Sequence, residues 1–125
     1  THFDLKQDVF FADFNWDAIN KNKNFKHKYE SISKYPQIRR DLSLLISDDI
    51  GFSNINSIID KMKIQNLQDI NLFDVYKGKN LPSGKTSYSI SLTFADKSRT
   101  LTDFEIDKIM KTIINNFEKQ GIELR

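Results

Sequence analysis

Apolar and polar residues alternate most regularly between residues 72 and 94, in the stretch LFDVYKGKNLPSGKTSYSISLTF. Because successive side chains of a strand point to opposite faces, this alternation predicts two strands joined by a turn rich in glycine, proline and lysine. The second strand has an apolar face made of Tyr88, Ile90, Leu92 and Phe94. Its other face carries the small hydroxyl side chains of Ser87, Ser89, Ser91 and Thr93. The stretch therefore predicts a β-hairpin with one face that needs a cover and one that stays open.

The first strand of this hairpin carries the bulkier side chains. By the same alternation, Leu72, Asp74 and Tyr76 share one face, and Phe73 and Val75 share the other. We place Asp74 and Tyr76 on the open face, beside the serines. A flat sheet face with an aromatic ring and small polar groups suits a stacked, splayed-out nucleotide. On the residue pattern alone, an ordinary solvated face of an antiparallel sheet is the more common structure.

Two helices are predicted by apolar residues at helical spacing. The first begins at an N-cap at Ser53 and runs to about Met62. Its apolar stripe consists of Ile55, Ile58, Ile59 and Met62. The second begins after Thr102, which forms a capping box with Glu105, and ends near Gly121, a typical C-terminal cap residue. The stripe of the second helix consists of Ile106, Ile109, Met110, Ile113 and Phe117.

Two further strands complete the pattern. Residues 38–46 alternate, with Leu42, Leu44 and Ile46 on a core face, and residues 122–125 alternate again at the end of the chain. The order strand, helix, strand, strand, helix, strand predicts an α+β, ferredoxin-like βαββαβ split fold, with a four-stranded antiparallel sheet and two helices on one of its faces. The open face is then expected to carry Asp41, Ser43, Leu45, Asp74, Tyr76, Ser87, Ser89, Ser91, Glu123 and Arg125.

The residues before this fold follow a different pattern. Residues 9–16, VFFADFNW, are apolar on both faces, which predicts a strand buried on both sides, whose sheet would lie in an upstream domain. Residues 21–28, KNKNFKHK, are polar and basic and predict a linker. Since the chain begins at Thr1 rather than methionine, we expect a piece of a longer protein. We therefore divide the chain into residues 1–33, an N-terminal extension with one strand and a linker, and residues 34–125, the compact domain.

Composition removes several classes of chemistry. The chain has no cysteine, which excludes disulfides, thiol catalysis and cysteine-based zinc sites, and fits a reducing compartment such as the cytoplasm. The two histidines, His2 and His27, lie outside the compact domain, so serine–histidine catalysis and a metal site are not expected. No apolar run is long enough for a membrane span. The net charge of +2 is too weak to indicate a nucleic-acid partner by itself.

Two local patterns of the compact domain invite a catalytic or nucleotide-binding interpretation. In GKNLPSGKT, five residues separate Gly78 from Gly84, whereas the phosphate-binding loop has four and precedes a helix, so we interpret this segment as a turn. Asp41 and Asp74 could face each other across neighbouring strands as an acid–base pair. Carboxylates paired with Arg39, Arg40 or serine hydroxyls are the simpler interpretation, and we expect no catalytic residue in this chain.

Four segments of the chain form a specific combination. They are YPQIRRDLSLLI at 35–46, LFDVYKGKNLPSGKTSYSISLTF at 72–94, RTLTDFEIDKIM at 99–110 and ELR at 123–125. With them, residues 35–125 resemble the ferredoxin-fold anticodon-binding domain that ends the β subunit of bacterial phenylalanyl-tRNA synthetases. The leader, FDLKQDVFFADFNWDAI, resembles the final strand of the catalytic-like domain that precedes this module in that family.

The resemblance implies a function and partners. The parent enzyme is a class II, ATP-dependent ligase of composition (αβ)₂, whose α subunit holds the site for phenylalanine, ATP and magnesium. This chain would then bind the anticodon stem-loop of tRNA(Phe) in the cytoplasm, without a cofactor or catalysis of its own and without a membrane. Tyr76 matches the aromatic residue that stacks on the first anticodon base, and Asp74, Ser87 and Arg125 match further positions of that site. Contacts with phosphates are expected from Lys77, Lys79 and Lys85.

Another class of function remains open. A ferredoxin-like sheet can also serve as a protein-interaction or regulatory module, because a fold alone does not determine function. An exposed Leu45 and the apolar leader favour this alternative. An enzyme similar to the acylphosphatases, which share this fold, is a more distant alternative.

Overall fold

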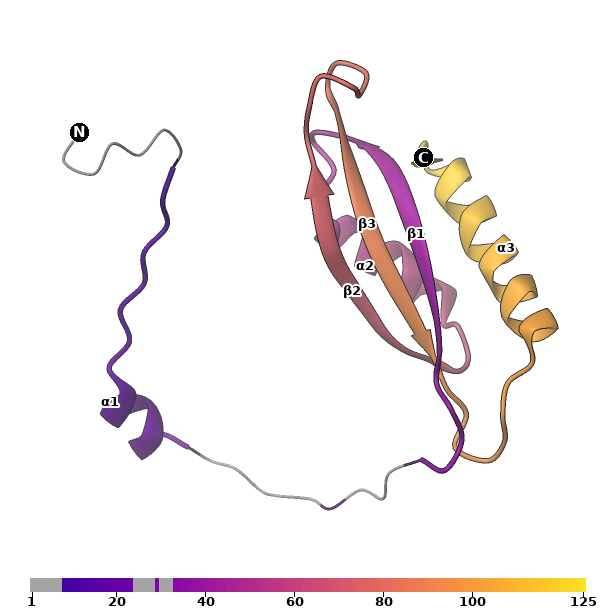
Figure 1. Cartoon of the computed structure of the whole chain (residues 1–125), viewed down its shortest axis with the longest axis horizontal. Coiled ribbons are helices and arrows are strands. Elements are labelled where there is room, and N and C mark those ends of the chain that lie inside the picture. The colour runs from indigo at the N-terminus through magenta and orange to yellow at the C-terminus, as the bar shows by residue number, and fades with distance from the viewer. Residues whose placement is uncertain (1–7, 24–28, 30–32) are drawn as a thin grey trace. The chain divides into compact units, whose positions relative to one another are not determined.

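The computed structural model describes residues 8–23, residue 29 and residues 33–125. The chain divides into two compact units, residues 1–31 and residues 32–125. The second unit contains strands β1 (Ile38–Ser47), β2 (Leu67–Tyr76), β3 (Lys85–Phe94) and β4 (Glu123–Leu124). Its two helices are α2 (Phe52–Met62) and α3 (Asp103–Lys119) (Figure 1).

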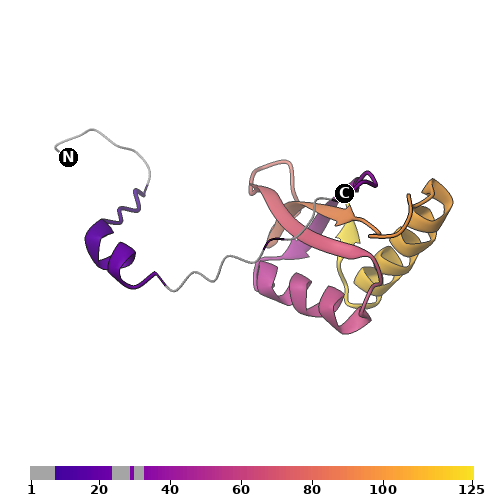
Figure 2. The ribbon, with the colours of Figure 1, turned by 90° about the horizontal axis from the view of Figure 1, so that it is seen from below.

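The four strands form one sheet in the order β2-β3-β1-β4, and every neighbouring pair is antiparallel. Helices α2 and α3 lie on the same side of this sheet, and the other face has no helix over it (Figure 2). The predicted ferredoxin-like arrangement is confirmed.

The core lies between the sheet and the two helices. Leu44 and Ile46 of β1 and Ile90, Leu92 and Phe94 of β3 are fully buried there. The helices bury the stripes that their spacing predicts, with Ile55 and Ile59 from α2 and Ile106, Met110, Ile113 and Phe117 from α3. Burial of this continuous apolar layer is the main force that holds the sheet against the helices.

The ends of α3 are set by local hydrogen bonds. At the start, the Glu105 backbone N–H donates to Oγ1 of Thr102, and the Thr102 backbone N–H donates to Oε2 of Glu105. At the other end, Gly121 has φ +75°, and the N–H of Ile122 donates to the carbonyl of Phe117. Glycine adopts this left-handed conformation at little energetic cost, so the chain can reverse direction here and enter β4. The predicted capping box and glycine cap are both confirmed.

The start of α2 differs from the prediction. The helix begins at Phe52, and its N-cap is Gly51 rather than Ser53. The Gly51 N–H donates to Oδ1 of Asn54, and the hydroxyl of Ser57 donates to the carbonyl of Ser53 within the helix. Gly51 has no side chain that could accept from the first turn, and the Asn54 side chain instead ties the helix start to the Gly51 N–H.

Two predicted face assignments in β2, those of Leu72 and Phe73, are wrong. The register shifts between Leu72 and Asp74, so that Leu72 pairs with the core residue Ile90 and Asp74 pairs with Ser89. Such a bulge places two successive residues opposite one and changes the alternation. Leu72 therefore packs against the core, and Phe73 lies on the open face.

The predicted strand at residues 9–16 is not formed. Residues 8–15 are exposed without regular structure, and α1 (Trp16–Lys21) is a short helix with an exposed surface. Asn15 caps this helix, since its side-chain Oδ1 accepts from the Ala18 N–H at 2.9 Å. The described residues of this first unit contain no strand, and a strand without a neighbour leaves its backbone groups unpaired. Residues 24–28, most of the predicted linker, lie outside the described residues, as do His2 and His27.

Candidate nucleic-acid interface

On the open face of the sheet, β3 lies between β2 and β1. The serines of β3 are small, whereas the strands on both sides carry long side chains that reach over them. Ser87 and Ser91 are therefore only 2% and 4% exposed, although they lie on the face without helices. Ser89, between them, is more accessible, and its hydroxyl lies 3.5 Å from the Ser43 hydroxyl of β1. On this face the accessible Ser89 thus lies between two covered serines. Two contacts between an aromatic ring and a guanidinium group cross β3 here, and we call them the first and second bridges. The surface around Ser89 is the gap between them.

The first bridge joins Tyr76 to Arg125. Tyr76 pairs with Ser87 in the sheet, and the Arg125 guanidinium carbon lies 5.3 Å from the centre of the tyrosine ring. Nη1 of Arg125 also donates to Oγ of Ser87 at 3.4 Å, while its backbone N–H donates to the carbonyl of Ser43 at 2.9 Å. Three of the four predicted base-reading residues thus come together, from three different segments of the chain. The fourth, Asp74, lies opposite Ser89 at the edge of the gap.

Gly78 fixes the place of the Tyr76 side chain. A Cβ atom at Gly78 would lie 2.7 Å from Cζ of Tyr76 and closer still to its hydroxyl oxygen. Carbon atoms in contact keep about 3.5–4.0 Å apart, so any side chain at this position requires the ring to move. The glycine of the LFDVYKG segment therefore does more than form a turn, because it leaves room for the phenol.

The second bridge joins Phe73 to Arg39 and was not predicted. The Arg39 guanidinium carbon lies 5.2 Å from the centre of the Phe73 ring, and Nε of Arg39 donates to Oδ1 of Asp41 at 2.7 Å. Phe73 nevertheless stays 49% exposed. Sequence alternation hid this pair because the bulge in β2 has no recognisable residue signature in this segment. Asp41 pairs with Arg39, as the simpler interpretation of the sequence expects. Strand β3 lies between the strands of Asp41 and Asp74, so the two carboxylates do not face each other across neighbouring strands.

The three candidate phosphate-binding lysines are in different situations. Nζ of Lys77 lies 2.5 Å from Oδ2 of Asp48, and Nζ of Lys85 lies 3.5 Å from Oε1 of Glu123. The hydrogen bond from Lys77, followed by the one from the Thr86 hydroxyl, holds the pKa of Asp48 below its ordinary value. Lys79, in the turn after Tyr76, makes no hydrogen bond or ion pair within the part of the chain that the structure describes. Of these three lysines, Lys79 can therefore bind an anion without first breaking an ion pair.

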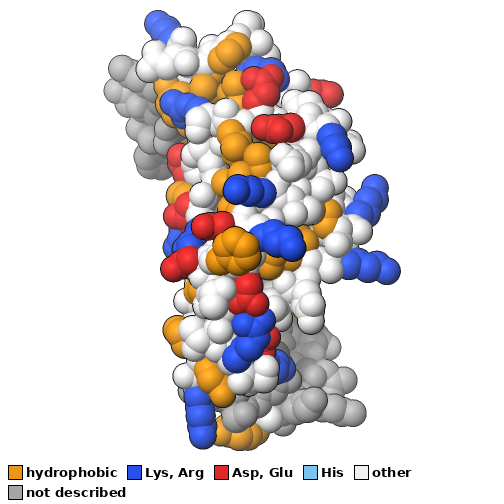
Figure 3. Space-filling view, turned by 90° about the vertical axis from the view of Figure 1, so that its right-hand side faces the viewer, with side chains coloured by type: hydrophobic (Ala, Val, Ile, Leu, Met, Phe, Trp, Pro, Cys, Tyr) orange, Lys and Arg blue, Asp and Glu red, His pale blue; other side chains and the backbone are white. Residues whose placement is uncertain are grey.

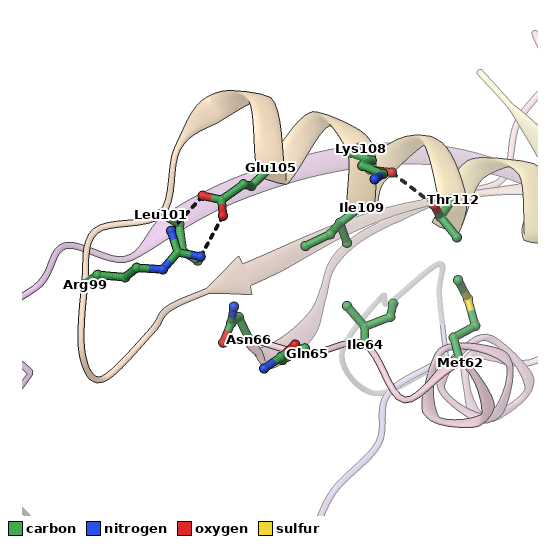
Figure 4. A pocket seen from close by; sticks show the side chains of 10 residues that line it. All are labelled: Met62, Ile64, Gln65, Asn66, Arg99, Leu101, Glu105, Lys108, Ile109 and Thr112. Carbon is green, nitrogen blue, oxygen red and sulfur yellow. Dashed lines mark hydrogen bonds and ion pairs between the residues drawn. The ribbon is translucent and has the colours of Figure 1, made fainter.

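The helical side of the domain offers a different feature. A cavity of about 410 Å³ opens between the end of α2 and the start of α3, lined by Met62, Ile64 and Ile109 among others (Figure 4). Of its charged residues, Arg99 and Glu105 pair with each other at 2.6 Å and 2.9 Å, and the third is Lys108. On the side of the molecule where α3 lies, positive, negative and apolar side chains are interspersed without a large area of one kind (Figure 3). Neither feature resembles a surface for a polyanion.

Other classes of site are not supported by the described residues. Residues 8–23, 29 and 33–125 contain no group of three or more carboxylate or histidine side chains placed to hold a metal ion. No helix among them is both long and apolar enough to cross a membrane. The open sheet face is therefore the feature with the most distinctive chemistry.

Comparison with known proteins agrees with this architecture. Residues 33–125 match the family model of the ferredoxin-fold anticodon binding domain. The chain belongs to this family. It is 42% identical over 125 residues to the phenylalanine–tRNA ligase β subunit of Bacteroides fragilis, and 39% identical over 128 residues to that of Clostridium tetani. These alignments cover 98% and 99% of this chain but only 15% and 16% of the two relatives.

Proposed function

We propose that this chain is the anticodon-binding part of a phenylalanine–tRNA ligase β subunit, and that its open sheet face binds the anticodon stem-loop of tRNA(Phe). The observation that carries the proposal is the bridge of Tyr76 and Arg125 over Ser87. It brings an aromatic ring and a planar cation together on the open face, above the buried hydroxyl of Ser87. Unstacked RNA bases bind to such surfaces through stacking on the ring and hydrogen bonds from their edges.

In this proposal each residue has a separate role. A base stacks on Tyr76 and displaces the guanidinium of Arg125, which then donates to a base edge or a phosphate. Asp74 accepts a hydrogen bond from a base amino or imino group, and the Ser87 hydroxyl donates or accepts beside it. Lys79 approaches the backbone directly, whereas Lys77 and Lys85 first exchange the carboxylates of Asp48 and Glu123 for phosphates.

The chemistry of aminoacylation is assigned to other parts of the assembly. We propose that the α subunit of an (αβ)₂ enzyme holds phenylalanine, ATP and magnesium, and that residues 1–33 join this domain to a preceding catalytic-like domain of the β subunit. The enzyme would act in the cytoplasm, where tRNA is aminoacylated. The domain studied alone should bind RNA and form no aminoacyl ester.

The proposal is tested by titrating the chain with the tRNA(Phe) anticodon stem-loop and with a loop of scrambled anticodon, at two salt concentrations. We expect the matched loop to bind more tightly at both. Tyr76→Ala should remove that preference and weaken binding by about 1–3 kcal/mol, the usual contribution of one base–aromatic stack. Tyr35→Ala is the matched control, because Tyr35 is 37% exposed, nearly the same as the 36% of Tyr76, and lies outside the sheet.

Two results would contradict the proposal. The first is equal binding of both loops by the unmodified chain, lost equally when salt is added, which would leave only attraction between lysines and phosphates. The second is unchanged binding by a folded Tyr76→Ala variant. A dimer in sedimentation that is broken by substitution of Leu45 would instead favour the protein-interaction module.

A further inference from the structure

We infer that Phe73 and Arg39 form a second base-stacking site on the open face, for a nucleotide other than the one held by Tyr76. The inference rests on the proposed function, because it assigns a further subsite to the same RNA-binding surface.

The first argument is the similarity of the two bridges. In each, an aromatic ring from β2 meets a guanidinium from the far side of β3, at 5.3 Å for Tyr76 and 5.2 Å for Phe73. In each, a serine of β3 is buried on that same face. The two pairs thus offer the same chemistry, a π-face and a planar cation, and both components stack on nucleobases.

The second argument is the conformation that exposes Phe73. Regular alternation would turn this side chain toward the core side of the sheet, and the bulge between Leu72 and Asp74 turns it to the open face instead. Bulges often redirect a side chain beside a functional site. Phe73 stays half exposed there, so its ring surface is accessible to a ligand on the open face.

The third argument is spacing. Three strand residues separate the positions of the two rings by about 10 Å, whereas bases stacked on each other are about 3.4 Å apart. Two bases on these rings therefore cannot stack on each other and must be splayed, as is usual for single-stranded loops on a protein surface. The gap between the rings exposes Ser89, Ser43 and Asp74, which can bond to the edges of both bases.

The experiment combines protein variants with altered RNA. Phe73→Leu and Tyr76→Leu each keep apolar bulk and remove the π-face. Phe104→Leu is the control, since Phe104 is 80% exposed on α3. Each variant of the full chain is titrated by fluorescence anisotropy with the intact anticodon stem-loop and with loops in which one nucleotide at a time is abasic. Urea unfolding verifies that every variant is folded.

We expect Phe73→Leu to weaken binding of the intact loop by about fivefold or more, and Phe104→Leu to leave it unchanged. With the abasic site at one position of the loop, Phe73→Leu should no longer weaken binding. With the abasic site at a different position, Tyr76→Leu should no longer weaken binding. This pattern identifies two rings that hold two nucleotides.

The outcomes separate this inference from the proposed function. If Tyr76→Leu weakens binding and Phe73→Leu does not, the second site is wrong and the first stands. If Phe73→Leu weakens every abasic loop equally, its effect is general and the second site is again overturned. If the unmodified chain does not prefer the matched loop, the proposed function itself fails. A dimer that dissociates on Phe73→Leu would assign this bridge to a protein partner.

Discussion

Gly78→Ala is the substitution that tests whether the position of the Tyr76 ring matters. The added methyl carbon would lie 2.7 Å from Cζ of Tyr76. This is about 1 Å closer than carbon atoms in contact. The ring must rotate, and in doing so it leaves Arg125. The substitution thus alters the candidate stacking site without changing any side chain that is expected to touch RNA.

The magnitude follows from three terms. Moving the ring off its rotamer costs about 0.5–1.5 kcal/mol. Losing the guanidinium contact costs about 0.5–1 kcal/mol at an exposed site. Replacing glycine by alanine also stabilises the folded domain by about 0.4–1 kcal/mol, because it lowers the conformational entropy of the unfolded chain. This third term is the same whether or not the Tyr76 ring is present. The ring-dependent cost, which is the sum of the first two terms, is therefore about 1–2.5 kcal/mol.

A double-mutant cycle isolates that ring-dependent cost. Urea unfolding is measured for the unmodified chain, Gly78→Ala, Tyr76→Ala and the double variant, and binding of the anticodon stem-loop is measured for the same four proteins. We expect Gly78→Ala to destabilise the chain and weaken RNA binding when Tyr76 is present. In the Tyr76→Ala background it should be neutral or slightly stabilising. An equal effect of Gly78→Ala in both backgrounds would refute the reasoning, since the clash is with the ring alone.

Two further predictions concern stability. The hydrogen bonds from Arg99, and then those from Thr102, lower the pKa of Glu105 from 4.5 to about 2. A carboxylate whose pKa is lowered by folding stabilises the fold at pH values above its ordinary pKa. This stabilisation is lost as the pH falls toward the lower pKa of the folded state. The free energy of unfolding should therefore fall more steeply between pH 5 and pH 2 than in Glu105→Gln, and parallel curves in urea titrations would contradict this. Ile113→Ala should cost about 2–5 kcal/mol in urea unfolding, because Ile113 is fully buried between α3 and the sheet. The exposed Lys111→Ala serves as its control, and a cost below 1 kcal/mol for Ile113→Ala would show that the core is not packed as described.

Sequence patterns predict correctly those elements for which many residues indicate the same structure. Helix α3 combines five apolar positions at helical spacing with a capping box and a glycine cap, so its limits follow from the sequence. Strand β3 has eight alternating positions, and their faces were assigned correctly. The same alternation placed Tyr76, Ser87 and Arg125 on one face.

The errors occur where one local contact outweighs a pattern. The bulge in β2 moved Leu72 into the core and Phe73 onto the open face, and no glycine or other marker in this segment predicts it. The pattern of residues 9–16 predicts a strand because its apolar residues favour burial. A strand also needs a neighbouring strand to pair with, and the pattern does not show whether one is present. The cation–π bridges depend on distances across the sheet, which a list of faces does not contain.

The first bridge also depends on the order in which the chain is synthesised. It needs Tyr76 from β2, Ser87 from β3 and Arg125, which follows β4. A ribosome makes the chain from its N-terminus, and domains fold as their residues emerge. The first three strands and α2 can assemble early, yet the guanidinium over the tyrosine arrives only after α3 has turned back along the sheet. A nascent chain interrupted before residue 125 would therefore display the tyrosine without its arginine, so the contact between the two side chains forms only after α3 and β4 are in place.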